Sequence, residues 1–136
     1  MTPKDFATKW FGALDSKNYD VLKSMLSPSH KFDNPMTPQP VDGATHLGIT
    51  QQMNSSFSEG RHTIDQMVCE GDWVTVRATW SGKHTGDFNG VPPTGKTITL
   101  KFIDLMHVVN NQLNEEYMMF DMQSFIGQVA GAAQTA

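Results

Sequence analysis

The chain has 136 residues, of which 38% are hydrophobic and 18% are charged. This length fits one domain with a single core, and no apolar run approaches the ~20 residues that span a bilayer, so we expect no membrane association. The formal net charge is −4 and the basic residues are scattered singly, which argues against nucleic acid as a partner. A single cysteine excludes an intrachain disulfide, and no secretory signal is visible at the start, so we expect a cytoplasmic protein.

The first half of the chain has the spacing of helices. Thr2, Pro3 and Asp5 predict a helix start, and the apolar residues that follow recur at i, i+4 and i+8: Phe6, Trp10 and Leu14. A second short helix is predicted to end at Ser27-Pro28, and a short strand is predicted over 30–34. Asp42 is expected to cap a third helix that ends at Gly60, with three apolar residues on one face: Ile49, Met53 and Phe57.

The second half predicts strands. Residues 61–70 and 73–83 flank the turn Gly71-Asp72, and residues 97–109 and 112–120 flank Asn110-Asn111, because both dipeptides suit two-residue hairpin turns. A last helical turn or two is predicted around 125–129. The expected fold is therefore α+β over residues 1–136, with helices packed on the concave face of a curved antiparallel sheet and with 130–136 as a disordered tail.

The second predicted hairpin can be read in register. An uninterrupted ladder from Asn110-Asn111 places Asp104 opposite Tyr117, in the middle of a face that is otherwise apolar: Ile98, Leu100, Phe102, Met106 and Met119. The other face mixes polar and apolar residues, which predicts the interface of a homodimer or higher homo-oligomer: Thr99, Lys101, Ile103, Leu105 and Met118.

Asp104 is the most informative candidate for chemistry. Burial would raise the pKa of its carboxyl and suit it to proton transfer or hydrogen-bond donation near neutral pH. The alternative is a structural carboxylate that is satisfied by Tyr117 or by a backbone amide. Asp121 has a similar pair of interpretations, because it could act on a ligand or cap the closing helix.

The remaining reactive side chains give weaker signals. His107 lies outside the apolar face and is expected at the surface or in an interface. His30, His46, His62 and His84 show no metal-ligand spacing, so no metal site is predicted. Cys69 has no evident base beside it, which argues against a covalent nucleophile.

Several motifs resemble the SnoaL-like polyketide cyclase family. Gly71 to Trp80 resembles its "GD-x-V-x-v-r" strand, and the loop from Gly82 to Gly95 resembles its glycine-proline hairpin, which is the most specific match. Ile103 to His107 resembles the next strand, and Asp121 to Val129 resembles the closing helix. The resemblance covers nearly the whole chain.

The resemblance implies a cone-shaped α+β barrel like that of ketosteroid isomerase, and acid/base ring closure without cofactor or metal. Asp104 falls where the cyclases have a pocket histidine. The acid/base aspartate of the cyclases falls on Met118 in an ungapped comparison, and the nearest carboxylate is Asp121. The strand pattern and the resemblance together give the candidate site. Its catalytic candidates are Asp104, Asp121 and Tyr117, and its ligand-binding candidates are Trp10, Leu14, Asn34, Phe57, Phe102, Met106, Met118 and Met119.

Two main functions therefore remain open. The first is an enzyme that carries out aldol cyclisation or isomerisation on a small hydrophobic carbonyl compound, without a cofactor. The second is a non-catalytic domain that binds a small hydrophobic molecule in the same pocket. A third possibility is a dimerising module whose core is filled.

Overall fold

The computed structural model describes residues 1–131 and begins with two capped helices. Thr2 caps α1 (Pro3–Asp15) as predicted, since its side chain accepts a hydrogen bond from the Asp5 amide. The Asp5 carboxylate also accepts one from the Thr2 amide. This reciprocal pair satisfies two amides that lack helical partners. The short α2 (Tyr19–Met25) follows, and its first turn is capped by Asn18. Both helices turn their apolar side chains into the core.

The third helix is shorter than predicted. Asp42 caps α3 (Gly43–Ser56), but the helix ends four residues before Gly60 because Phe57 is already extended, with φ −128° and ψ 128°. Phe57 is therefore the first residue of β2 (Phe57–Glu70), not part of a helix face. Its ring packs beside Phe125 in a smaller core cluster at one end of the molecule.

The sheet has five strands in the order β1-β5-β4-β3-β2. These are β1 (Leu26–Asp33), β2, β3 (Trp73–His84), β4 (Thr97–Val109) and β5 (Gln112–Phe120). Strands β2 to β5 form the expected antiparallel meander, but β1 pairs with β5 in parallel, so the sheet is mixed rather than wholly antiparallel. β1 and β2 remain its edges, so the sheet curls without being closed by hydrogen bonds.

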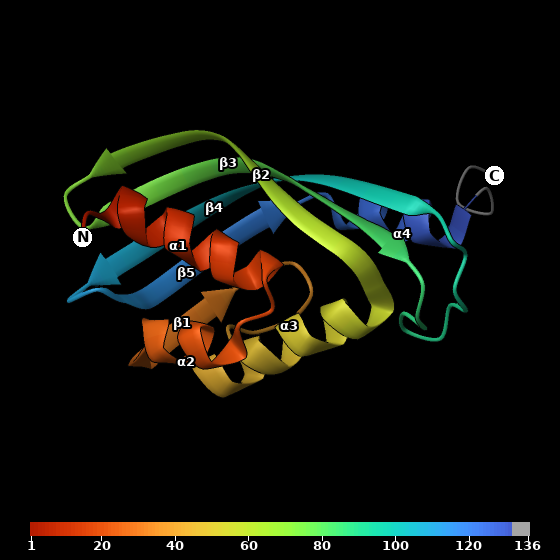
Figure 1. Cartoon of the computed structure of the whole chain (residues 1–136), viewed down its shortest axis with the longest axis horizontal. Coiled ribbons are helices and arrows are strands. Elements are labelled where there is room, and N and C mark those ends of the chain that lie inside the picture. Colours follow the sequence, from red (N-terminus) through yellow and green to blue (C-terminus); the bar gives the residue numbers. More distant parts are fainter. Residues whose placement is uncertain (132–136) are drawn as a thin grey trace.

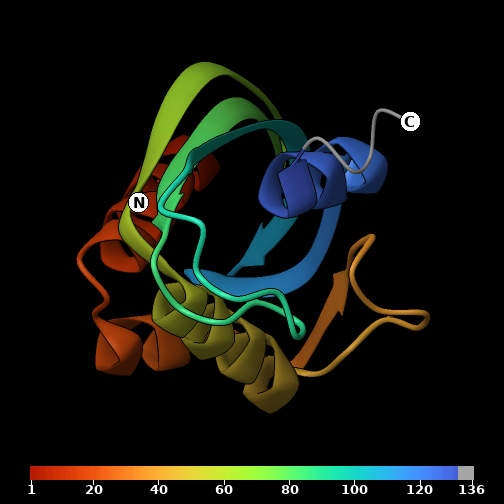
Figure 2. The same ribbon diagram turned by 90° about the vertical axis from the view of Figure 1, so that its right-hand side faces the viewer.

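The helices lie around the hollow of the curled sheet. Figures 1 and 2 show α1 and α3 against the concave side and α4 (Met122–Ala130) near the far ends of the strands. The prediction of a disordered tail over 130–136 is wrong for Ala130, which is the last residue of α4. Residues 132–136 lie outside the part that the structure describes. None of the described helices is long and apolar enough to cross a membrane.

A β-bulge in β5 changes which residues face the core. Next to the turn, Val109 pairs with Gln112 and Val108 with Leu113, as predicted. Asn110 and Asn111 both have positive φ there, which suits this type of hairpin turn. The ladder then skips Asn114, so that His107 pairs with Glu115 and Asp104 pairs with Met118.

One inserted residue reverses every later side chain of a strand. Glu116 consequently points into the core with 1% exposure, and Met118 points into the hollow of the sheet. Tyr117 and Met119 point outward, with 39% and 69% exposure. The predicted pairing of Tyr117 with Asp104, and the predicted inward position of Met119, are therefore wrong.

Candidate functional site

A cavity of about 120 Å³ lies between the helices and the concave face of the sheet. At roughly 10–15 Å³ for each water-sized occupant, it has room for about ten non-hydrogen atoms. Every layer of the fold contributes to its largely apolar wall, which includes Trp10, Leu14, Phe32, Ile49, Met53, Trp80, Leu100, Phe102, Met118, Phe120 and Phe125. The site candidates Trp10, Leu14, Phe102 and Met118 thus lie around one space.

Other candidates lie elsewhere. Asn34 is buried in the loop after β1, where its amide bonds Thr37 and the Met36 backbone. Met106 is fully buried in the main core, and Phe57 belongs to the smaller cluster. The Asp121 carboxylate accepts a hydrogen bond from the Ser124 amide and caps α4, the alternative interpretation of that residue. None of these four lines the cavity.

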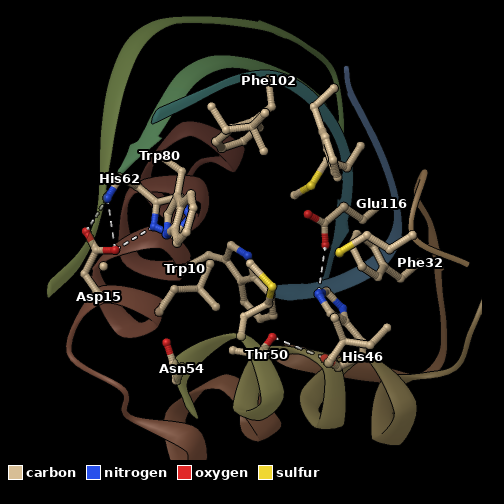
Figure 3. Close-up of a pocket in the computed structure, with 18 of the residues that line it drawn as sticks. Trp10, Asp15, Phe32, His46, Thr50, Asn54, His62, Trp80, Phe102 and Glu116 are labelled. Carbon is tan, nitrogen blue, oxygen red and sulfur yellow. Dashed lines mark hydrogen bonds and ion pairs between the residues drawn. The ribbon is translucent and has the colours of Figure 1, made fainter. Parts of the chain in front are cut away.

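Polar side chains gather at two opposite ends of the cavity (Figure 3). At one end, His62 of β2 meets Asp15 at the last turn of α1. The Asp15 carboxylate accepts hydrogen bonds from the His62 backbone amide, at 3.0 and 3.1 Å, and from His62 Nδ1, at 2.5 Å. A proton on Nδ1 leaves Nε2 as the unprotonated nitrogen of a neutral ring, an arrangement that orients histidine as a base.

At the other end, Glu116 lines the cavity and has Asp104 behind it. Asp104 is fully buried and does not line the cavity itself. Neither of its oxygens, nor Glu116 Oε1, has an N–H or O–H donor from another described residue. Two ionised carboxylates buried side by side without donors would be very costly, whereas a shared proton lets one carboxyl donate to the other.

The titration of this pair follows from its burial. Burial raises the pKa of Asp104 to about 6, against the opposing effects of the Glu116 hydrogen bond and of His62 when its ring is protonated. Burial also raises the pKa of Glu116 well above its usual range, and the nearby Asp104 charge raises it further. We therefore assign the shared proton at neutral pH to Glu116, the member that faces the cavity.

Two histidines extend this end of the site. His46 of α3 lies with its ring stacked on Phe32, at a centroid distance of 3.8 Å, and its Nε2 is 3.8 Å from Glu116 Oε1. Its Nδ1 is 3.0 Å from Nε2 of His30, which is buried on β1. Burial lowers the pKa of His30 to about 4 and that of His46 to about 3, so both rings are neutral at pH 7.

His30, His46 and Glu116 are also the described residues that could hold a metal ion, since ligand atoms from all three lie within 4.8 Å of one another. No spacing in the sequence indicates this cluster, because its members come from three separate elements. The two imidazoles, however, already bond each other through the nitrogens that face one another, at 3.0 Å. An ion would have to separate them, since both lone pairs must point at the metal about 2.0–2.1 Å away. The present arrangement fits a hydrogen-bonded chain better than a metal site.

Sequence reasoning missed Glu116, His46, His62 and Asp15. The inward position of Glu116 could have been found from its own strand. Leu113 and Met118 are both apolar but five residues apart, and a strand with regular alternation cannot turn both toward the core. That conflict indicates a bulge between them. The pairing of Asp15 with His62 carries no such local signal, since the two residues are 47 positions apart.

The curled sheet, the helices over its hollow and a cavity with ionisable groups define an α+β protein with the ketosteroid isomerase-like fold. The sequence profile of the SnoaL-like polyketide cyclase family matches residues 4–129, so the chain belongs to that family. The comparison with curated proteins found no match.

Solved structures agree on the fold. IdmH of Streptomyces antibioticus, a candidate polyketide cyclase, is 24% identical with a TM-score of 0.85, over 96% of this chain and 100% of that one. A candidate SnoaL-like polyketide cyclase from Jannaschia sp. CCS1 is 19% identical with a TM-score of 0.85, over 95% and 92% of the two chains. A Catenulispora acidiphila protein with a ketosteroid isomerase-like fold, solved with trimethylamine, is 16% identical with a TM-score of 0.78, over 98% and 97%.

Proposed function

We propose that this protein catalyses cofactor-free acid/base chemistry, aldol cyclisation or isomerisation, on a small hydrophobic carbonyl compound. The observation that carries the proposal is one apolar cavity with a carboxylate-oriented histidine at one end and a protonated carboxyl at the other. A histidine held by a carboxylate and a carboxyl kept protonated by burial can supply a base and an acid in one cavity. Membership of a cyclase family supports the same reaction class.

The roles follow from the contacts. His62 Nε2 would remove a proton from the carbon next to the substrate carbonyl, while Asp15 holds the imidazole and stabilises the cation that forms. Glu116 would turn its proton from Asp104 to the carbonyl oxygen and donate a hydrogen bond there as negative charge develops. Asp104 does not reach the cavity, so it would act through Glu116 as a positioning residue. Tyr117 has no part in this scheme, because it lies on the other face of the sheet, where its hydroxyl bonds Glu115.

The test uses a reaction common to every such substrate, the exchange of the proton next to a carbonyl. 2-Tetralone, a neutral ketone of suitable size, is incubated with the protein in D₂O, and deuterium incorporation is followed by NMR. We expect catalysed exchange that falls ~10²–10⁴-fold in His62→Gln, the usual loss when a general base is removed. Glu116→Gln keeps a hydrogen-bond donor but has no acidic proton, so exchange should also be slower in this variant.

His107→Phe is the matched control, because His107 lies on the outer face of the sheet against Trp73, away from the cavity. It should exchange at the wild-type rate. Exchange no faster with protein than without it, although 2-tetralone binds, would contradict the enzymatic proposal and favour the non-catalytic binding domain.

A further inference from the structure

The contact between His30 and His46 links the protonation of the two rings. His30 Nδ1 has no hydrogen-bond partner among residues 1–131, and the Leu113 carbonyl is the polar group that acts on this ring, raising its pKa against the effect of burial. Because a carbonyl favours an N–H over a lone pair, we place the His30 proton on Nδ1.

The next link follows from the first. A neutral His30 with its proton on Nδ1 has a lone pair on Nε2, and this atom lies 3.0 Å from His46 Nδ1. His46 Nδ1 must therefore be the donor, and its own proton is used in that bond. His46 Nε2 then carries a lone pair, because both rings are neutral at pH 7.

This lone pair lies at the cavity without a partner of its own. Its polar neighbour, Glu116 Oε1, is 3.8 Å away, beyond hydrogen-bond distance, and that oxygen has no other donor among the described residues. His46 and Glu116 both line the cavity, and His46 cannot easily turn away, since its ring is stacked on Phe32 and contacts Trp10. An acceptor and a protonated carboxyl thus lie 3.8 Å apart in the cavity wall, a separation that one oxygen bonded to both would bridge.

We propose that His46 Nε2 and the Glu116 carboxyl form a two-point site for a neutral hydroxyl group, so that this end of the cavity selects enols and phenols over ethers and carboxylates of the same skeleton. The hydroxyl hydrogen is donated to His46 Nε2, and the hydroxyl oxygen accepts from Glu116, whose proton turns from Asp104 toward the ligand. A carboxylate is disfavoured because two neutral imidazoles offer it no positive charge, while Asp104 behind Glu116 is negative. The inference shares Glu116 with the proposed function, whose substrate would bind here through its enolic oxygen.

The test compares three probes that share one bicyclic skeleton: 2-naphthol, 2-methoxynaphthalene and 2-naphthoate. Calorimetric titration at pH 7 should give a Kd for 2-naphthol about tenfold or more below that of the ether, since the ether leaves the His46 Nε2 lone pair without a donor in a buried site. His46→Phe, which keeps the aromatic packing on Phe32, should lose this preference. His107→Phe should keep it, because that histidine is also stacked on an aromatic ring but lies outside the cavity.

A second measurement does not depend on any variant. Nitrogen-15 spectra of the histidine rings should show His46 protonated at Nδ1, and 2-naphthol should shift the Nε2 resonance while 2-methoxynaphthalene does not. A proton on Nε2 of His46 in the free protein would overturn the proposal. Equal affinity for naphthol and ether, tightest binding of naphthoate, or no binding of any probe would also overturn it. Hydroxyl selectivity without 2-tetralone exchange would leave this inference standing and remove only the catalytic proposal.

Discussion

Asp104 is the residue that the sequence singled out, and its place in the structure explains why its role was only partly predictable. An aspartate on an apolar strand face was expected to be buried, and it is, with 0% exposure. Its expected partner was Tyr117, but the carboxyl beside it is Glu116. The burial of Asp104 follows from the regular alternation of side chains along β4. The residue that lies beside it depends on β5, where the alternation is reversed at Asn114.

The paired carboxyls predict a particular dependence of stability on pH. A carboxyl whose pKa is raised by folding keeps its proton where the unfolded chain has released it. Its contribution to the free energy of unfolding is therefore largest in acid and is lost as pH rises through the folded pKa, from about 4 to about 6 for Asp104 and further for Glu116. Asp104→Asn removes one of the two titrations and the charge that raises the pKa of the other.

We expect Asp104→Asn to gain stability relative to wild type as pH rises from 5 to 8, by an amount on the order of a few kcal/mol, since each pKa unit is worth about 1.4 kcal/mol. Urea unfolding at several pH values measures the difference. The comparison with wild type is essential because His30 and His46, with lowered pKa values, make stability rise with pH below about 6.5 in both proteins. A difference that is constant across this range would show that the two carboxyls do not share a proton.

Among the elements, those defined by local signals were predicted well. Thr2 and Asp42 cap their helices, and both two-residue turns join the strands that they were expected to join. Features set by longer-range packing were not. The parallel pairing of β1 with β5 and the early end of α3 depend on contacts between segments that are distant in the sequence. Hydrophobic periodicity and capping residues do not predict such contacts.

The bulge at Asn114 is the element-scale feature on which the site depends. Deleting Asn114 would restore an uninterrupted ladder, turn Tyr117 and Met119 inward, and drive Glu116 and Met118 out of the core. We expect the deletion to abolish cooperative thermal unfolding, followed by near-ultraviolet circular dichroism.

Asn114→Ala is the control that keeps the residue count. It removes the side-chain oxygen that accepts hydrogen bonds from Ser27 and Ser29, at 3.1 and 2.8 Å, and should cost only about 1–3 kcal/mol. If the deletion were no more harmful than this substitution, the register of β5 would not control the core.

At the scale of the whole molecule, the outer face of the sheet is too apolar to be left in water. Two rows of cross-strand neighbours run over it: Val68, Thr75, Leu105 and Tyr117 in one, and Arg77, Ile103 and Met119 in the other. Val68, Ile103, Tyr117 and Met119 are 58%, 50%, 39% and 69% exposed. The predicted interface face differs from the observed one at Met118, which points into the cavity. Its two neighbours along the strand, Tyr117 and Met119, point outward instead.

We propose that a second copy of the chain covers this outer face, because a sheet surface with mixed polar and apolar rows can pair with itself around a two-fold axis. A stable pair of this kind buries about 800 Å² on each partner, so a charge at its centre should be highly disruptive. Analytical ultracentrifugation at micromolar concentration should give a dimer for wild type and a monomer for Ile103→Glu. Ile126→Glu places the same charge on the 41% exposed Ile126 of α4, and should remain dimeric. A wild-type monomer, or equal dissociation by both substitutions, would refute an interface on this face.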